Sequence, residues 1–208
     1  MKKLAIAASS VALAAMPVVG VFAVAGDGTV VDNLSVTVQP SCSISGDGTE
    51  SGTAPALTYT KSVNFGNITN GTSDTADGST MTVFCNDGSG WYVNAVGGNV
   101  TGTGQTAVSN LNGALNTSTP IAAGTATTGT ASSWAMKITK ISGDVESDMT
   151  TFAAAPTSAT KVAHSAKETS TTTSDQIKAE YQVYIGTAQE ADTYTGSVTY
   201  TLVHPNSN

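Results

Sequence analysis

The sequence predicts an all-β protein in which two antiparallel sheets pack face to face as a β-sandwich. Several segments alternate apolar and polar residues with a period of two, so each strand has one face for the core and one for water. The composition is rich in Thr, Ser, Gly and Val, and only 11% of the residues are charged, which favours strands and turns over helices. The third observation is a pair of cysteines, Cys42 and Cys85, that border predicted strands.

These two cysteines are expected to form one disulfide bond. They are the only cysteines in the chain, and an exported protein with a single pair normally oxidises it. A metal site is the alternative, but the two histidines, His164 and His204, fall in no ligand spacing with them. Closing a loop of about forty residues would stabilise the fold by roughly 4 kcal/mol in the chain-entropy model.

The first 25 residues have the pattern of a secretory signal peptide. The pair Lys2-Lys3 provides a positive start, residues 4–24 are apolar, and Ala23-Val24-Ala25 matches a cleavage site. The mature chain is then expected to begin at Gly26 and to be secreted or displayed at the cell surface. A retained membrane anchor is the alternative, and no other segment is long enough to cross a bilayer.

The charge of the expected mature chain argues against two classes of partner. All eight basic residues are lysines, and two of them leave with the signal, so six lysines face fifteen acids and the formal charge is −9. Nucleic acids and anionic membrane surfaces attract clusters of Arg and Lys, which this chain lacks. We interpret the excess of acidic residues as a surface charge that keeps a secreted protein soluble.

The alternating segments predict strands along most of the mature chain. The last two, joined by residues 187–192, are expected to form an antiparallel hairpin. In the last strand Tyr194, Val198, Tyr200 and Leu202 share the apolar face. In chain order the predicted strands cover residues 34–38, 57–65, 81–85, 91–95, 134–138, 177–185 and 194–202.

The expected organisation is a signal peptide (1–25), an N-terminal extension or first strand (26–41) and a β-sandwich domain (42–208). Residues 43–55 and 67–79 are expected as loops. Two longer stretches, 97–133 and 142–175, are rich in Gly, Ser, Thr and Ala and have little periodicity. They are long for loops of a compact domain, so they either contain further edge strands or decorate the surface.

Both ends of the mature chain resemble the superfamily of spore coat protein U-like domains and chaperone–usher fimbrial pilins. The N-terminal half is similar in four motifs, and the end of the chain is similar to the last strand of pilins. The resemblance covers about half of the mature chain. In order, the motifs are Leu34-x-Val-x-Val-Gln-Pro-Ser-Cys42-Ser-Ile, Val63-Asn-Phe-Gly66, Thr80-Met-Thr-Val-Phe-Cys85-Asn, Trp91-Tyr-Val and Ala191-Asp-Thr-Tyr194-Thr-Gly196-Ser-Val-Thr-Tyr-Thr-Leu202.

This resemblance implies an immunoglobulin-like sandwich that lacks its last strand. In such subunits the missing strand exposes an apolar groove, which an N-terminal extension from the next subunit fills. The protein would then be a secreted subunit of a fimbria or surface coat that supports adhesion. It would self-associate into a fibre, with a periplasmic chaperone and an outer-membrane usher as further possible partners.

The donor strand that matches this pattern is the segment 29–39. Its apolar face would consist of Val30, Leu34, Val36 and Val38, and Asp32 on the same face departs from a clean apolar donor. The alternative is that residues 34–38 are the first strand of the domain itself. The two interpretations stay open, because a donor segment can run directly into a first strand.

No catalytic motif is present in the sequence, and no enzyme activity, cofactor or metal is expected. The chain has no Gly-x-Ser-x-Gly, His-Glu-x-x-His or phosphate-binding loop, and Asn86-Asp-Gly-Ser-Gly90 has the composition of an ordinary turn. The alternative to a structural subunit is a self-complete, monomeric adhesin or carbohydrate-binding module. In that protein Trp91, Tyr92 or Trp134 would line the sugar-binding face, whereas sandwiches more often use tryptophan in the core.

Overall fold

The structure, a computed structural model, describes residues 35–36, 41–53, 56–98, 110–114, 118–166 and 174–204. These residues contain strands and no helix, which confirms the all-β prediction. Residues 39–208 belong to one compact unit. The predicted signal peptide (1–25) and three of the four predicted donor residues, Val30, Leu34 and Val38, lie outside the described residues.

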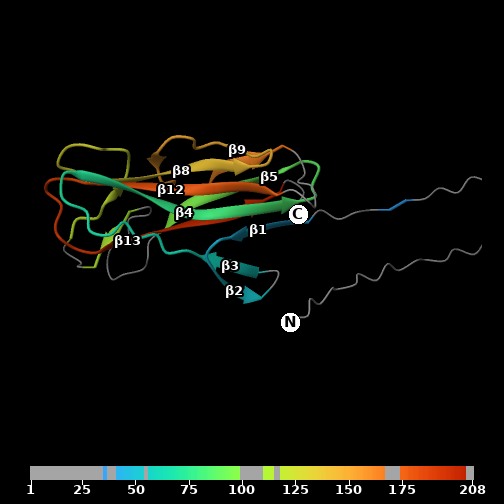
Figure 1. Ribbon diagram of the computed structural model, residues 1–208, viewed down its shortest axis with the longest axis horizontal. Coiled ribbons are helices and arrows are strands. Elements are labelled where there is room, and N and C mark those ends of the chain that lie inside the picture. The colour runs from blue at the N-terminus through green and yellow to red at the C-terminus, as the bar shows by residue number, and fades with distance from the viewer. Residues whose placement is uncertain are drawn as a thin grey trace, which may run out of the picture. The chain divides into compact units, whose positions relative to one another are not determined.

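The larger sheet has six strands, and all but one of its pairings are antiparallel (Figure 1). The exception is β7, which lies parallel to β8. The strand order is β1 (Cys42–Gly46), β4 (Thr72–Cys85), β12 (Asp175–Ile185), β8 (Ser133–Ser142) and β10 (Ala153–Ala154), with β7 (Ala122–Ala123) also on β8.

The smaller sheet has four antiparallel strands, and two short ribbons accompany the sheets. In the four-stranded sheet the order is β14 (Ser197–Val203), β5 (Trp91–Gly98), β11 (Thr160–Ser165) and β9 (Glu146–Ser147). The two ribbons are the hairpin of β2 (Thr49–Thr53) with β3 (Ala56–Thr60) and the pair of β6 (Asn112–Gly113) with β13 (Tyr194–Thr195).

The hydrophobic core lies between these two sheets, as in a β-sandwich. Alternate residues of each strand point inward, and the largest of them are fully buried. Burying each such side chain stabilises the fold by about 1.5–3 kcal/mol relative to leaving it in water. The six-stranded sheet contributes Val83, Met136, Ile138 and Ile177, and the four-stranded sheet contributes Trp91, Val93 and Val162.

The prediction of a hairpin formed by the last two long strands is wrong. Strand β12 is in the middle of the six-stranded sheet, whereas β14 pairs with β5 at one end of the four-stranded sheet. The connection between them therefore crosses from one sheet to the other. Period-two alternation showed that both strands face a core, but it does not show which sheet a strand joins.

Several predicted boundaries also differ from the structure, and the stretch expected as the loop 43–55 contains most of β1 and all of β2. Strand β4 begins at Thr72, inside the stretch expected as the loop 67–79. Conversely, residues 61–69 are not in a strand, although Val63 and Phe65 continue the alternation of β3. The two described residues of the predicted strand 34–38, Ser35 and Val36, also have no strand pairing.

The two stretches expected as long loops contain short strands. Between residues 97 and 133 the chain forms β6 and β7, and between 142 and 175 it forms β9, β10 and β11. Strand β11 surrounds the segment Lys161-Val-Ala-His164 and widens the smaller sheet beside β5. Most of these strands are two residues long, too short for a periodic pattern to reveal them.

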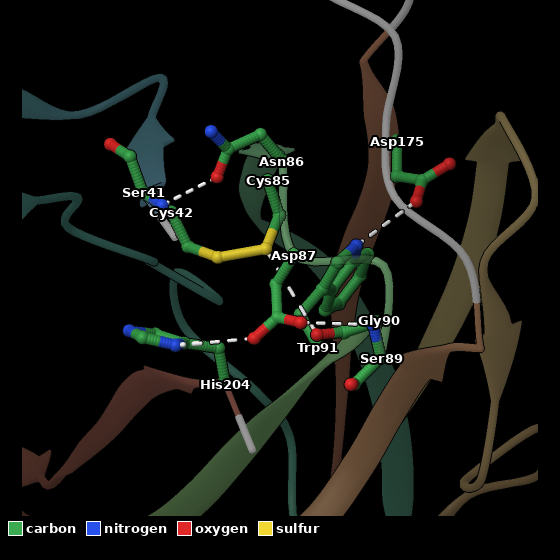
Figure 2. Close-up of a disulfide and its surroundings, with 10 residues drawn as sticks. All are labelled: Ser41, Cys42, Cys85, Asn86, Asp87, Ser89, Gly90, Trp91, Asp175 and His204. Atoms are coloured by element: carbon green, nitrogen blue, oxygen red, sulfur yellow. Dashed lines mark hydrogen bonds and ion pairs between the residues drawn. A yellow bond between two sulfur atoms is a disulfide. The ribbon is translucent and has the colours of Figure 1, made fainter. Parts of the chain in front are cut away.

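The disulfide bond between Cys42 and Cys85 is confirmed. The two residues lie directly opposite each other in the antiparallel pair of β1 and β4, with their Cα atoms 4.0 Å apart. Beside the bond, the Ser41 amide donates to the side-chain oxygen of Asn86, and the Asn86 amide donates to the Ser41 carbonyl (Figure 2). The disulfide therefore fixes the register of an edge strand only five residues long.

Replacing both cysteines with alanine is expected to lower the free energy of unfolding by about 4 kcal/mol, because the bond closes a loop with a sequence separation of 43. Urea unfolding of the oxidised protein and the double variant measures the difference. The control is Ser43→Ala, an exposed position on the same strand. A double variant as stable as the wild type would show that β1 does not depend on the bond.

Candidate functional site: the open side of the sandwich

One side of the sandwich is left without a strand that its topology would accommodate. In immunoglobulin constant-type domains the sheets have the orders A-B-E-D and C-F-G. Here β1, β4, β12 and β8 follow the order A-B-E-D, and β5 and β14 correspond to C and F. Within the described part of the chain no strand pairs with the outer edge of β14, where strand G would lie.

The outer edge of β14 lies on the same side of the molecule as the outer edge of β1. Among the described strands, β14 pairs with β5 alone and β1 with β4 alone, and the two come close across the gap between the sheets. We call this region, bounded by β1 and β14, the open side. Backbone groups at such strand edges are available to an added strand.

Half-buried apolar side chains line the open side. On β14, Val198, Tyr200 and Leu202 point inward and pack against the core without being fully covered. The residues between them, such as Thr199, are exposed. Ile44 of β1 is also half-buried against the core. An additional strand with alternating apolar side chains would cover this surface.

Strand β14 lacks the features by which proteins usually protect a free edge. It runs in unbroken register with β5 from Ser197 to Val203 and contains no lysine, proline or bulge. The opposite side of the sandwich, where β8 and β9 lie, is different, and we call it the opposite seam. Strand β9 has only two residues, and a cavity of about 490 Å³ at this seam is bordered by Lys140 and Glu146. Short, charged edges discourage strand addition, and long neutral edges invite it.

Two tyrosines connect the sheets beneath the open side. The hydroxyl groups of Tyr181 on β12 and Tyr200 on β14 are 2.9 Å apart. Burial raises the pKa of Tyr181 above the ordinary value of 10.0. Burial, with the neighbouring phenol as a further cause, raises the pKa of Tyr200 well above that value. Both phenols are therefore neutral at physiological pH, and the pair fixes the middle of β14 to the opposite sheet.

Stability is expected to fall as the pH rises above about 10, because the unfolded chain releases these two protons at a pH where the folded protein still holds them. Below that pH the contribution is fully present. Urea unfolding at a series of alkaline pH values measures the loss. In the double variant Tyr181→Phe/Tyr200→Phe the part of this pH dependence due to the two phenols should disappear, and an unchanged profile would contradict the assignment.

At neutral pH the single and double variants of this pair should not be additive. Either Tyr181→Phe or Tyr200→Phe leaves one buried hydroxyl without its partner, which costs about 1–3 kcal/mol, whereas replacing both removes the unsatisfied group. The double variant is therefore expected to cost less than the sum of the single variants in urea unfolding.

The end of β14 is anchored beside the disulfide (Figure 2). His204, the residue after β14, places Nδ1 3.6 Å from Oδ2 of the buried Asp87. The other carboxylate oxygen of Asp87 accepts a hydrogen bond from the Ser89 amide within the turn 86–90. Gly90 is required in this turn, because its φ is +82° and a Cβ atom would lie 2.0 Å from the Ser165 carbonyl oxygen.

The tryptophans are core residues, as sandwiches more often use them, so these two side chains do not line a sugar-binding face. Trp91 is 2% exposed and Trp134 is 4% exposed. The Trp91 indole N–H donates to the buried carboxylate of Asp175, which also accepts from the Asp144 amide. Tyr92 is the residue of this group that faces outward, half-buried beside His164 on the outer face of the four-stranded sheet.

Trp91→Phe is expected to destabilise the fold by at least about 2 kcal/mol, because it removes a donor from a buried carboxylate and leaves a smaller ring in the core. Tyr92→Phe, one residue along and on the outer face, should change the stability little. Urea unfolding followed by tryptophan fluorescence of the remaining indole compares them. Equal stabilities would contradict the role of the Trp91–Asp175 bond.

Each histidine lies beside a carboxylate, and the two pairs are in different parts of the domain. Nδ1 of His164 lies 2.8 Å from Oδ2 of Asp148 on the outer face of the smaller sheet, and His204 contacts Asp87 beside the disulfide. The residues that the structure describes contain no cluster of three or more His, Cys, Asp or Glu side chains able to hold a metal ion. They also contain no apolar helix of membrane-spanning length.

The structure describes one of the four residues predicted to form the donor face. Val36 is 88% exposed and is not in a strand. The four residues predicted for the last strand are all half-buried on the core, Tyr194 in β13 and the others in β14. Ile44 was not predicted as part of the site, although its position two residues after Cys42 continues the alternation.

Comparisons with known proteins give no relative. No protein family, no curated protein and no solved structure matches the chain.

Proposed function

We propose that this protein is an exported structural subunit that polymerises into a fimbria or surface coat by donating a β-strand to the open side of a second copy. One observation carries the proposal: the place of the seventh strand beside β14 is unfilled in the described chain, and the edge there is long, neutral and lined by half-buried apolar side chains. A free edge of this kind is an aggregation hazard unless a partner uses it.

The proposed donor is the segment 29–39. Its apolar face of Val30, Leu34, Val36 and Val38 has the alternation that an added strand needs to place side chains on the core while its backbone pairs with β14. The signal pattern of residues 1–25 and the disulfide fit export to an oxidising compartment.

The resemblance to spore coat protein U-like domains and pilins supports the same function, and it implies further partners. Assembly of exported subunits with an open apolar side requires that this side be protected before polymerisation. A periplasmic chaperone and an outer-membrane usher are the partners that the resemblance implies. Adhesion would then be a property of the assembled fibre rather than of a sugar-binding face made by Trp91 and Trp134.

A charge placed on the donor face is expected to prevent assembly. Val36→Asp would bring an unpaired carboxylate to the apolar open side of the next copy, which is strongly unfavourable. Ser35→Asp adds the same charge one position away, on the opposite face of the strand, and is the matched control. Both residues are exposed in the free chain, so neither substitution should change the stability of the subunit.

Size-exclusion chromatography and gel analysis without boiling measure the result. Wild-type protein and Ser35→Asp should form oligomers that resist detergent, and Val36→Asp and a deletion of residues 26–39 should remain monomeric. Assembly of the deletion variant would rule out donation by this segment. Equal behaviour of the two aspartate variants would show that the alternation of the segment does not matter.

A further inference from the structure

The segment between β3 and β4 contacts the core without belonging to either sheet. Over Ser62–Ile68 the residues Val63, Phe65 and Ile68 are half-buried and the others are exposed. Phe65 and Ile68 pack against the hydrophobic core. The segment therefore has the side-chain pattern of an edge strand and covers part of the core with apolar groups.

The backbone of this segment has no partner in the described protein. No backbone hydrogen bond joins residues 62–68 to another described segment, and the single amide bond among them runs from Gly66 to the side-chain oxygen of Asn64 at 2.8 Å. Two side chains therefore hold the segment on the core without a hydrogen-bonded ladder. Removing it from the core would break no backbone bond to the sheets.

The two ends of the segment place it along the open side. At its start, Lys61 donates to the Asp47 carboxylate and to the Gly78 carbonyl, both at 2.8 Å. Asp47 in turn follows β1 and pairs with Thr80 of β4. At its end, the chain enters β4 at Thr72 (Figure 1). Lys61 therefore lies beside the end of β1, and residues 62–70 run from there to the start of β4, where the Gly71 amide donates to the Ile185 carbonyl of β12.

We infer that Ser62–Ile68 is a built-in cover of the open side, which an incoming strand from a second copy displaces. The inference rests on the proposed function and adds a step to it. Before assembly, Phe65 and Ile68 shield the core at the edge where the seventh strand is missing. During assembly, the apolar side chains of the donor segment replace them, and the anchors at Lys61 and Thr72 keep the released cover attached.

Such a cover solves a problem that an open-sided subunit has in solution. An uncovered apolar side would pair with any exposed strand, whereas a hydrogen-bonded cover would block the intended partner as well. Cover and donor compete for the same apolar surface, but only the donor adds backbone hydrogen bonds to β14. The competition therefore favours the donor. The cover lowers the apparent affinity of the donor, because the donor binds only the fraction of subunits in which residues 62–68 have left the core.

The first test compares the segment before and after assembly of the wild-type protein. If the cover is released, chymotrypsin should cut the Phe65–Gly66 bond faster in the oligomer than in the monomeric Val36→Asp variant. Amide hydrogen exchange on the same samples should show new protection in β14 and none in residues 62–68. Protection of residues 62–68 together with β14 would mean that the segment stays on the core in the oligomer. The inference that an incoming strand displaces it would then be wrong.

The second test weakens the cover and measures the rate of assembly. Phe65→Ala and Ile68→Ala should each speed assembly severalfold. They lower the fraction of subunits in which residues 62–68 cover the core, and they leave the sequence of β14 unchanged. Met149→Ala is the matched control, since Met149 is also half-buried against the core but packs at the opposite seam beside Ile138. Slower or unchanged assembly of both cover variants would overturn the inference.

The two proposals fail in distinguishable ways. If assembly depends on the donor segment but residues 62–68 become protected, the proposed function is supported and the inference of a displaceable cover is wrong. A wild-type protein that stays monomeric at all concentrations removes the proposed function and the cover with it. If either alanine variant fails to fold, the exchange and proteolysis measurements on the wild-type protein still decide the question.

Discussion

The outer edge of β14, with which no described strand pairs, is the constraint around which the rest of the structure is organised. Backbone amides and carbonyls at a sheet edge must be paired, covered or left to water. At the opposite seam the protein uses very short strands and charged side chains, including Lys140 and Glu146. On the open side it uses neither, and no strand of the described chain pairs with the long neutral edge of β14.

Three contacts around this edge hold its position. The disulfide fixes β1 in register on β4. The Tyr181–Tyr200 contact ties the centre of β14 to the opposite sheet, and His204 and Asp87 hold its end. A strand fixed at its centre and at one end has less freedom to lose when a partner strand binds. That pre-organisation reduces the entropy lost when a partner strand binds.

Residue patterns identified the apolar faces well and the strand partners poorly. The inward residues of β14 and the pairing of Cys42 with Cys85 followed from period-two alternation and from the cysteine count. The sheet to which β14 belongs did not, because alternation is the same in either sheet. Nor could the role of Phe65 be seen, since its alternation with Val63 predicts a strand and the structure gives that segment no ladder.

The sequence by itself determined the fold class, the disulfide and the inward faces of β12 and β14, because these depend on local periodicity and on the residue types present. Only the tertiary structure decided that β12 and β14 lie in different sheets, that Trp91 and Trp134 are buried, and that no strand of the described chain lies beside the outer edge of β14. These features depend on which distant segments meet. Contacts between distant segments are selected by the packing of the whole core, which no local pattern records.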